Sequence, residues 1–177
     1  NFSDLFVSKL DPKGQWSTPV QLETGGIINT EANEGNPAVN SKFNQMYFTR
    51  CSNDKGTLQG CKIMVSRRAG RNWGEPKALD LGGDSTTVFG SPSISPDELT
   101  LVFTSNLPNG QGGKDIWMST RKSPNDNFGR AVNAGAVINT PSDEMFPFMR
   151  NDTTLYFSSN GHPGLGGLDI FRTTFSN

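Results

Sequence analysis

Two glycine-rich stretches have the residue types of an anion-binding loop. They read NLPNGQGGKDIW, Asn106 to Trp117, and NGHPGLGGLDIF, Asn160 to Phe171. A phosphate cradle needs backbone N–H groups aimed by the N-terminus of a following helix, but both stretches run into short segments typical of strands. We therefore interpret them as tight connections in which glycine supplies φ > 0 without strain. Their candidate binding residues are Asn106, Gly112, Gly113, Asn160, His162, Gly166 and Gly167.

An aspartate follows each glycine loop, and both aspartates invite comparison with a metal ligand. Asp115 and Asp169 hold this position, and Asp4 holds the same place near the start of the chain. A short carboxylate there can accept hydrogen bonds from backbone N–H groups of the turn, which predicts a structural role. Calcium binding is the alternative, because calcium prefers oxygen ligands. One carboxylate per loop supplies too few ligands for calcium, so we expect no metal and no cofactor.

Hydrolytic chemistry would require residues that the sequence does not bring together. His162 is the only histidine, and no nucleophile or oxyanion hole marks a Ser-His-Asp triad around it. We expect it to be an exposed turn residue. A glycosidase needs two carboxylates at a set separation across a cleft, whereas Glu34 and Glu144 are interpreted as equivalent positions of a repeat. No catalytic residue is predicted.

An internal repeat of 53 to 58 residues runs through the chain, and such a repeat defines the fold class. One landmark is a strand led by proline, at Pro37, Pro92 and Pro147. The next is a strand that ends in an aromatic residue, at Phe48, Phe103 and Phe157. The third is a strand that begins at Asp4, Lys62, Asp115 and Asp169. A fourth segment follows the third, led by Trp16, Trp73 and Phe128.

Four short strands per repeat are the signature of a β-propeller blade, whose usual length is about 40 to 50 residues. Residues 1–27 supply the last two strands of one blade, 28–81 and 82–137 are complete blades, and 138–177 supply the first three strands of another. A closed ring of four blades needs about sixteen strands. The sequence therefore predicts an all-β fold with minimal helix, built as an incomplete arc of a larger propeller.

The recurring phenylalanines Phe48, Phe103 and Phe157 are interpreted as core residues of the blades. A blade cannot bury its apolar faces alone, so neighbouring blades must stack on each other. Replacing one of these rings with alanine should cost about 3 to 5 kcal/mol, through lost burial and the cavity left behind.

Cys51 and Cys61 flank the hairpin in which the first complete blade departs from the repeat. They align with Asn106 and Lys114 of the next blade, at positions that face each other across the second and third strands. A disulfide is predicted if the compartment is oxidising, and two reduced thiols are the alternative. With no histidine nearby, the pair is a poor zinc site.

Composition excludes two classes of partner. Sixteen lysines and arginines against 17 aspartates and glutamates give a formal charge of −1, which leaves little attraction for the phosphates of a nucleic acid. No run approaches the 18 or so apolar residues of a membrane span, so no direct span is expected. Because the chain opens without a methionine or a leader, we expect a mature or excised piece of a longer protein.

Two stretches carry a family resemblance. SPSISPDELTLVFTSN, Ser91 to Asn106, and TLYFSSNGHPGLGGLDIF, Thr154 to Phe171, resemble the TolB-type, WD-like propeller repeat. VINTPSDEMFPF, combined with the last glycine loop, is similar to the propeller of periplasmic OmpA-family lipoproteins, including the PorE-like component of type IX secretion. The stretch RCSNDKGTLQGCKIM, Arg50 to Met64, departs from the pattern, and Lys62 replaces its aspartate.

The resemblance implies a non-catalytic scaffold that binds protein partners of the cell envelope. It implies a periplasmic location, with outer-membrane association or peptidoglycan anchoring through parts that are not in this chain. Bare blade faces invite association, so the remainder of its own chain or another copy should complete the propeller. Two alternatives stay open: a carbohydrate-active or hydrolytic propeller enzyme, and a propeller that binds calcium or a peptide.

Overall fold

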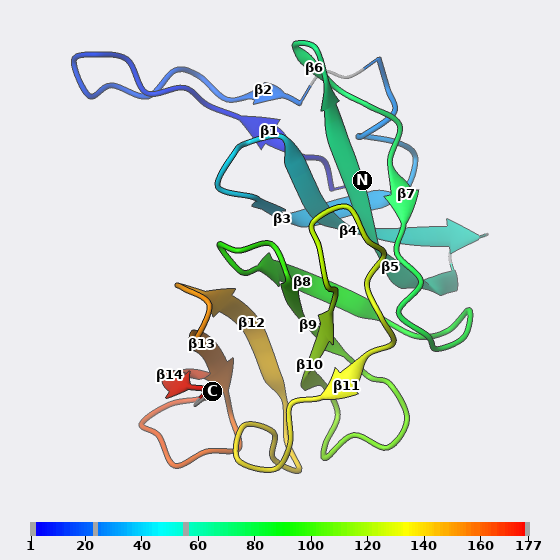
Figure 1. Ribbon diagram of the computed structural model, residues 1–177, viewed down its shortest axis with the longest axis vertical. Coiled ribbons are helices and arrows are strands. Elements are labelled where there is room, and N and C mark those ends of the chain that lie inside the picture. The colour runs from blue at the N-terminus through cyan, green and yellow to red at the C-terminus, as the bar shows by residue number, and fades with distance from the viewer. Residues whose placement is uncertain (1–2, 23–24, 55–56, 176–177) are drawn as a thin grey trace.

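The protein is an all-β molecule. A computed structural model describes residues 3–22, 25–54 and 57–175, and within these ranges it contains fourteen strands and no helix. Figure 1 shows these strands gathered into separate small sheets. The predicted fold class is confirmed. Consistent with this, the described residues contain no helix that could cross a membrane.

The strands form four antiparallel sheets in chain order. The first pairs β1 (Phe6–Val7) with β2 (Val20–Gln21). The second contains β3 (Asn33–Val39), β4 (Gln45–Asp54), β5 (Thr57–Ala69), β6 (Asn72–Trp73) and β7 (Lys77–Ala78). The third contains β8 (Phe89–Ile94), β9 (Thr100–Ser105), β10 (Asp115–Thr120) and β11 (Val132–Asn133). The fourth contains β12 (Glu144–Met149), β13 (Thr154–Ser159) and β14 (Asp169–Thr174).

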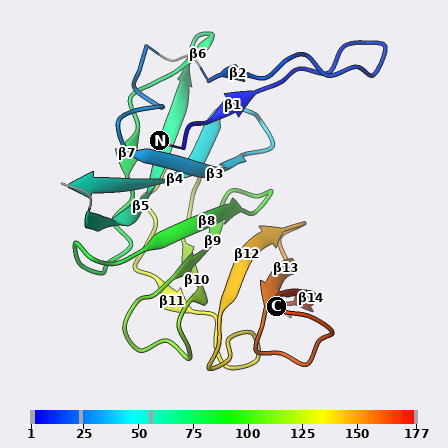
Figure 2. The same cartoon turned by 180° about the vertical axis from the view of Figure 1, so that it is seen from behind.

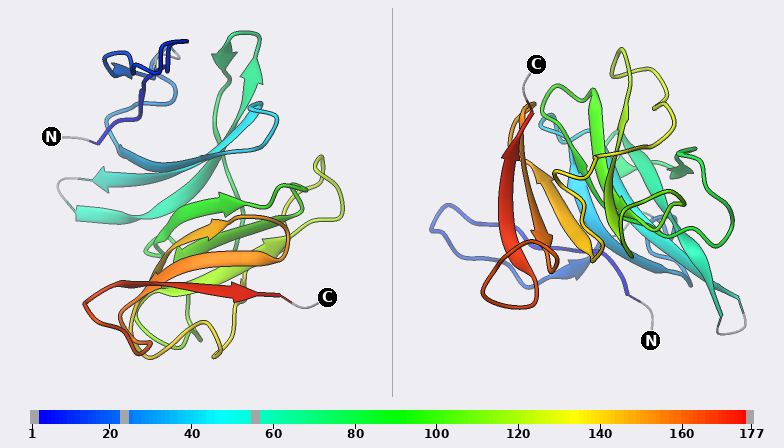
Figure 3. Two further views of the ribbon diagram at one scale, coloured as in Figure 1. Left: turned by 90° about the vertical axis from the view of Figure 1, so that its left-hand side faces the viewer. Right: turned by 90° about the horizontal axis from the view of Figure 1, so that it is seen from below.

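The larger sheets stack face to face as successive blades. Figure 3 shows the second, third and fourth sheets as three layers, and Figure 2 shows the same order from behind. The first strand of each, β3, β8 or β12, is the inner strand of its blade, and β8 contacts both β3 and β12. Phe48, Phe103 and Phe157 lie on β4, β9 and β13, in three separate sheets, and all three are buried.

Apolar layers between successive sheets form the core. Leu5 of the first sheet packs with Phe48 of the second, Ile63 of the second packs with Phe103 of the third, and Ile116 of the third packs with a cluster of the fourth that includes Phe157. The second and third sheets thus each bury one face against the preceding sheet and the other against the following sheet. This arrangement is what a stacked repeat requires, because one blade cannot cover both of its faces.

Within the described residues, no sheet covers the outer face of the last sheet. Leu5, Ile63 and Ile116 hold equivalent positions and are 6%, 1% and 0% exposed, because the next sheet covers each of them. Ile170 holds the same position on β14 and is 79% exposed. Ile116 and Ile170 are the same residue type at the same position of the repeat, so their exposed fractions differ because no described sheet covers Ile170. An incomplete arc accounts for this uncovered position.

This contrast predicts unequal costs for one substitution at two equivalent sites. Ile116→Ala should lower the free energy of unfolding by about 2 to 5 kcal/mol, because it leaves a cavity between two sheets. Ile170→Ala should change it by no more than about 0.5 kcal/mol, because its side chain is already in solvent. Urea denaturation of the two variants measures both values, and equal losses would contradict the stacked arrangement.

Candidate functional site

Each inner strand contains a β-bulge at the same position of the repeat. In β3, β8 and β12 the pairing register shifts across two residues, the second of which is proline. The first has a left-handed backbone, with φ of 50° at Asn36, 48° at Ser91 and 53° at Phe146. Non-glycine residues rarely adopt such values, and a residue before proline is normally extended. Strain of this kind persists only where its surroundings enforce it, and it clusters at functional sites.

The bulges border a groove along the inner strands. Its volume is about 530 Å³, and it is lined by residues 36–41, 91–96 and 146–149. All of these lining residues are uncharged. The groove therefore offers apolar surface and neutral hydrogen-bonding groups to a ligand.

Phe146 is exposed in this groove for a different reason from its neighbours. Phe148 is 59% exposed, whereas its equivalent Ser93 is buried beneath the following sheet, so the exposure of Phe148 reflects the bare outer face. Phe146 is 50% exposed, and its equivalents Asn36 and Ser91 are not buried either. The three left-handed residues thus form the row of side chains that the inner strands present to the groove.

Hydrogen bonds connect this row to the neighbouring sheets. The Asn36 side-chain amide donates to Ser91 Oγ at 3.0 Å, and the Ser91 N–H donates to Thr49 Oγ1 at 3.2 Å. The Met149 N–H donates to Ser93 Oγ at 2.9 Å. Adjacent inner strands are therefore held together by polar contacts as well as by packing.

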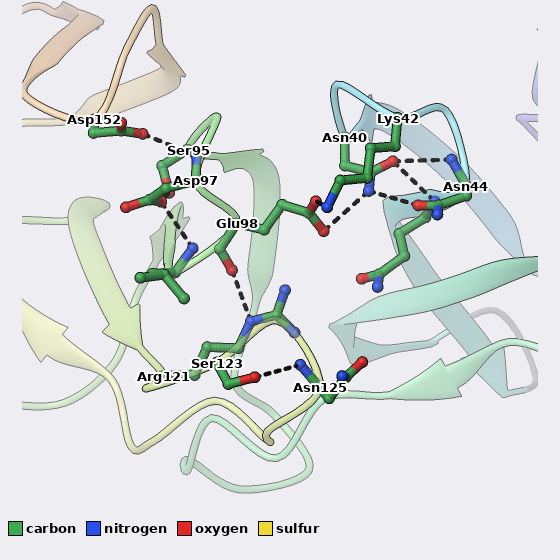
Figure 4. Close-up of polar contacts among 12 residues, drawn as sticks. Asn40, Lys42, Asn44, Ser95, Asp97, Glu98, Arg121, Ser123, Asn125 and Asp152 are labelled. Carbon is green, nitrogen blue, oxygen red and sulfur yellow. Dashed lines mark hydrogen bonds and ion pairs between the residues drawn. The ribbon is translucent and has the colours of Figure 1, made fainter.

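The turns that follow the inner strands form a linked rim, which Figure 4 shows in close-up. Glu98 of the third sheet is 3% exposed and has a φ of 66°. Its carboxylate accepts from Lys42 Nζ at 2.8 Å and from Asn40 Nδ2 at 3.0 Å, both in the second sheet's turn. The Asp97 N–H donates to Asp152 Oδ1 of the fourth sheet at 3.0 Å. One turn thus bridges three blades.

Charge balance at the rim keeps Glu98 ionised. Burial opposes its ionisation, but the bonds from Lys42 and Asn40 outweigh this and lower the pKa of the carboxyl group. Arg121 Nε donates to the Glu98 carbonyl oxygen at 2.7 Å, and its guanidinium also lies within hydrogen-bonding distance of the Tyr47 hydroxyl. Burial is the largest influence on Tyr47 and raises its pKa, although Arg121 opposes this.

The carboxylates of Glu34 and Glu144 are structural and equivalent. Both are buried, and each accepts from the hydroxyl of the threonine four residues earlier at 2.7 Å. Glu34 also accepts from Arg50 Nε at 2.8 Å, whereas Glu144 accepts from Ser159 Oγ at 2.7 Å. Every one of these partners lies within its own blade, so both carboxylates are occupied locally.

The segments that contain these glutamates bind the preceding sheet, and we call residues 29–34 and 139–144 the staple segments. Asn29 Oδ1 accepts from the Leu5 N–H at 2.8 Å, and Asn139 Oδ1 accepts from the Ile116 N–H at 2.8 Å. The Asn29 side-chain amide donates to the Leu5 carbonyl oxygen, and the Asn139 side-chain amide donates to the Ile116 carbonyl oxygen. Sequence reasoning noticed only the glutamates, although both asparagines also stand 110 residues apart.

The middle blade lacks this arrangement. Phe89 stands where Glu34 and Glu144 stand, and the hydroxyl of Ser105, the equivalent of Ser159, has no hydrogen-bond partner within the described residues. Asp84 is exposed, and hydrogen bonds from Thr86 contribute most to lowering its pKa. A hydrolytic propeller would need carboxylates that converge near Glu34, Asp84 and Glu144, but Asp84 is exposed whereas the two glutamates are buried.

The aspartates after the glycine loops accept hydrogen bonds from those loops. Asp115 accepts from the Gln111 N–H at 2.7 Å and from the Gly112 N–H at 3.2 Å, and burial raises its pKa. Asp169 accepts from the Gly166 N–H at 3.0 Å. Asp4 has a different partner, the side-chain amide of Gln21 at 2.6 Å.

The expected reason for the loop glycines was wrong. None of Gly112, Gly113, Gly166 and Gly167 has a positive φ. At Gly112 the reason is close approach, because an added Cβ would overlap the Ser142 carbonyl and lie 2.5 Å from that of Thr140. A Cβ on Gly113 would lie 2.7 Å from Asp143 Oδ1. The other two have nothing within 4 Å, and nothing in the structure explains them.

The remaining candidate residues of the glycine loops form hydrogen bonds with the backbone of the fold. Asn106 Oδ1 accepts from the Val88 N–H and Asn160 Oδ1 from the Asp143 N–H, both at 2.8 Å. His162 was expected to be exposed, but it is partly buried. Its Nε2 lies 2.8 Å from the Ile138 carbonyl oxygen, and its ring packs on Phe157 and Phe171. The apolar pocket between these two rings explains the difference.

Cys51 and Cys61 form the predicted disulfide. They lie directly opposite each other on β4 and β5, with Cα atoms 4.1 Å apart. The structure places this bond, the glycine loops and the inner-strand groove at separate positions and does not assemble them into one site. Among the described residues, no group of three or more His, Cys, Asp or Glu side chains could hold a metal ion.

Comparison with known proteins identifies the fold. No family model and no curated protein matches the chain. Among solved structures, it is similar to TolB from Acinetobacter baumannii, with a TM-score of 0.59 and 14% identity over 97% of this chain and 35% of TolB. It is also similar to a puromycin-hydrolyzing peptidase of Mycobacterium tuberculosis, with a TM-score of 0.56 and 15% identity over 100% of this chain and 27% of that one. The chain thus has a TolB-like propeller fold and spans about a third or less of these proteins.

The unequal serines predict opposite effects of one substitution. Ser159→Ala removes a bond to the buried Glu144 and should cost about 1 to 3 kcal/mol of unfolding free energy. Ser105→Ala should leave stability equal or higher, because it removes a buried hydroxyl that has no partner. Thermal and urea unfolding of both variants check this, and a loss at Ser105 as large as that at Ser159 would refute it.

The lowered pKa of Glu98 predicts acid sensitivity of the rim. A depressed carboxyl pKa stabilises the fold above the unfolded value of 4.5, and this contribution disappears as the pH falls through the folded value. The stability difference between wild type and Glu98→Gln should therefore be largest near neutral pH and shrink below 4.5. Glu31→Gln, at an exposed glutamate, serves as the control and should show little difference at any pH.

Proposed function

We propose that this chain is part of a non-catalytic propeller that binds proteins of the cell envelope through its inner-strand groove. The observation that carries the proposal is Phe146, an aromatic residue 50% exposed in a strained left-handed conformation on the wall of an uncharged groove. An exposed ring costs solvation without adding to the core, and strain adds a further cost. Binding of an apolar segment of a partner would offset both.

The surroundings of the ionisable residues support a non-catalytic role. The ring of His162 packs on two phenylalanines and its Nε2 contacts a backbone carbonyl. Glu34 and Glu144 are buried beneath their own hydrogen-bond donors. A rigid stack of sheets with an uncharged groove is better suited to holding a partner than to proton transfer, which needs an accessible acid or base.

The envelope is the proposed location because of the disulfide and the resemblance of the repeat. Disulfides persist in oxidising compartments such as the periplasm, and Cys51 and Cys61 form one. The similarity of the repeat to OmpA-family lipoproteins suggests that the partners belong to type IX secretion or to outer-membrane anchoring on peptidoglycan.

Phe146→Asn tests the proposal with a matched control. Asparagine tolerates a left-handed backbone better than phenylalanine does, and Asn36 already holds the equivalent position, so the variant should fold normally. Phe43→Asn is the control, because Phe43 is also exposed with a φ of 53° but does not line the groove.

The wild-type protein, immobilised on an affinity resin, should retain one particular envelope protein. Once purified, that partner should bind the Phe43→Asn variant with the same affinity as it binds the wild type. We expect at least tenfold weaker binding in Phe146→Asn, because one buried aromatic contact is worth about 1.4 kcal/mol or more. Equal binding by both variants, or turnover of a glycan or peptide substrate that depends on Glu144, would contradict the proposal and favour the hydrolytic alternative.

A further inference from the structure

The two staple segments hold the preceding sheet with the same four hydrogen bonds. Two come from the asparagine, whose side chain bonds both the N–H and the C=O of one residue: Leu5 for Asn29 and Ile116 for Asn139. The other two lie two residues earlier on the receiving strand. There the Ser3 N–H donates to Asn33 Oδ1 at 3.0 Å, and the Lys114 N–H donates to Asp143 Oδ1 at 2.9 Å.

The fourth bond completes the pattern at both interfaces. The Glu34 N–H donates to the Ser3 carbonyl oxygen at 2.8 Å, and the Glu144 N–H donates to that of Lys114 at 2.7 Å. Each staple segment therefore reads Asn-Thr-x-x-Asn/Asp-Glu. The threonine hydroxyl donates to the glutamate within each segment, which stabilises the conformation of the segment. The first asparagine and the fifth residue, Asn33 or Asp143, contact the neighbouring sheet.

An aliphatic residue precedes each staple segment and enters the apolar layer. Ile28 packs with Leu5, and Ile138 packs with Ile116. Both isoleucines are buried, at 0% and 4% exposed. The recognition element thus has two parts, an aliphatic side chain that packs on the receiving face and polar groups that bond its strand edge.

The last sheet carries the same receiving surface, and nothing in the described chain occupies it. Leu168 and Ile170 on and beside β14 are the equivalents of Lys114 and Ile116, and they are 46% and 79% exposed. The outer edge of β14 pairs with no strand of the described chain. An exposed strand edge with an apolar residue on it favours pairing with another segment.

We propose that the edge of β14 at Leu168 and Ile170 is a binding site for a segment of sequence aliphatic-Asn-Thr-x-x-Asn/Asp-Glu, carried by a further blade of the same repeat. The interface continues one that the molecule already uses twice, so its geometry is known from Asn29 and Asn139. This proposal does not depend on the function of the groove.

A second copy of the chain does not fit this site. Its staple segments already hold Leu5 and Ile116 within their own molecule, and releasing one would break an interface equal to the one gained. The middle blade offers no substitute, because Asp84 and Phe89 stand in place of the asparagine and glutamate. The occupant is therefore a blade other than those described.

A peptide titration followed by NMR tests the proposal on the chain as it exists. The probe is a synthetic peptide with the sequence of residues 134–146, AGAVINTPSDEMF. We expect saturable shifts of the Leu168 and Ile170 amide signals at up to millimolar peptide, with the Ile116 amide unchanged because its site is occupied. An otherwise identical peptide with Asn139→Ala should bind at least tenfold more weakly.

The chain provides its own matched control peptide. Residues 79–91, LDLGGDSTTVFGS, come from the equivalent place in the middle blade and lack the asparagine and glutamate. On the protein side, Ile170→Asp should abolish the shifts without unfolding the chain, because the residue is exposed. Three results would overturn the proposal: no saturable shift at Ile170, equal shifts with the control peptide, or a dimer that Ile170→Asp dissociates, which would identify a second copy as the occupant.

Discussion

Stacking of one sheet on the next is the interaction on which the rest of the structure depends. Each blade has apolar residues on both faces and gains stability from the neighbours that cover them. The contact has an apolar part, in which Leu5, Ile63 and Ile116 are buried by the following sheet. It also has a polar part, because Asn29 and Asn139 satisfy backbone groups of the preceding strand. Buried backbone groups need such partners, so the asparagines fix the register that packing alone leaves loose.

This constraint also explains how the groove can hold strained residues. The inner strands are linked to each other at the bulges and, through Asp97 and Glu98, at the rim. A rigid framework can impose a left-handed backbone on Asn36, Ser91 and Phe146, three residues that prefer other conformations. Because the backbone is the same at all three, their side chains can differ without disturbing the fold. The groove wall can therefore be polar at one blade and aromatic at the next.

The repeat made the fold predictable, whereas the site depended on details that the repeat conceals. The spacing of Phe48, Phe103 and Phe157 placed three strands in three sheets, and the aligned cysteines predicted the disulfide. The left-handed residues could not be predicted, because a residue before proline is normally extended. The loop glycines misled for a related reason: composition reveals that a small residue is needed, as at Gly112, but not whether the cause is φ or close approach. The asparagine contacts could have been found, since Asn29 and Asn139 share the spacing of Glu34 and Glu144.

Residue-resolved hydrogen exchange tests the central claim most directly. The amides of Leu5 and Ile116 donate to asparagine side chains of the following blade. If the blades are held together as described, these amides should exchange only when the interface opens. The amide of Ile170, at the same position of β14, should exchange far faster. We predict a difference of at least a hundredfold between Ile116 and Ile170. Equal exchange rates at the two amides would show that the blades stand independently and would contradict the account.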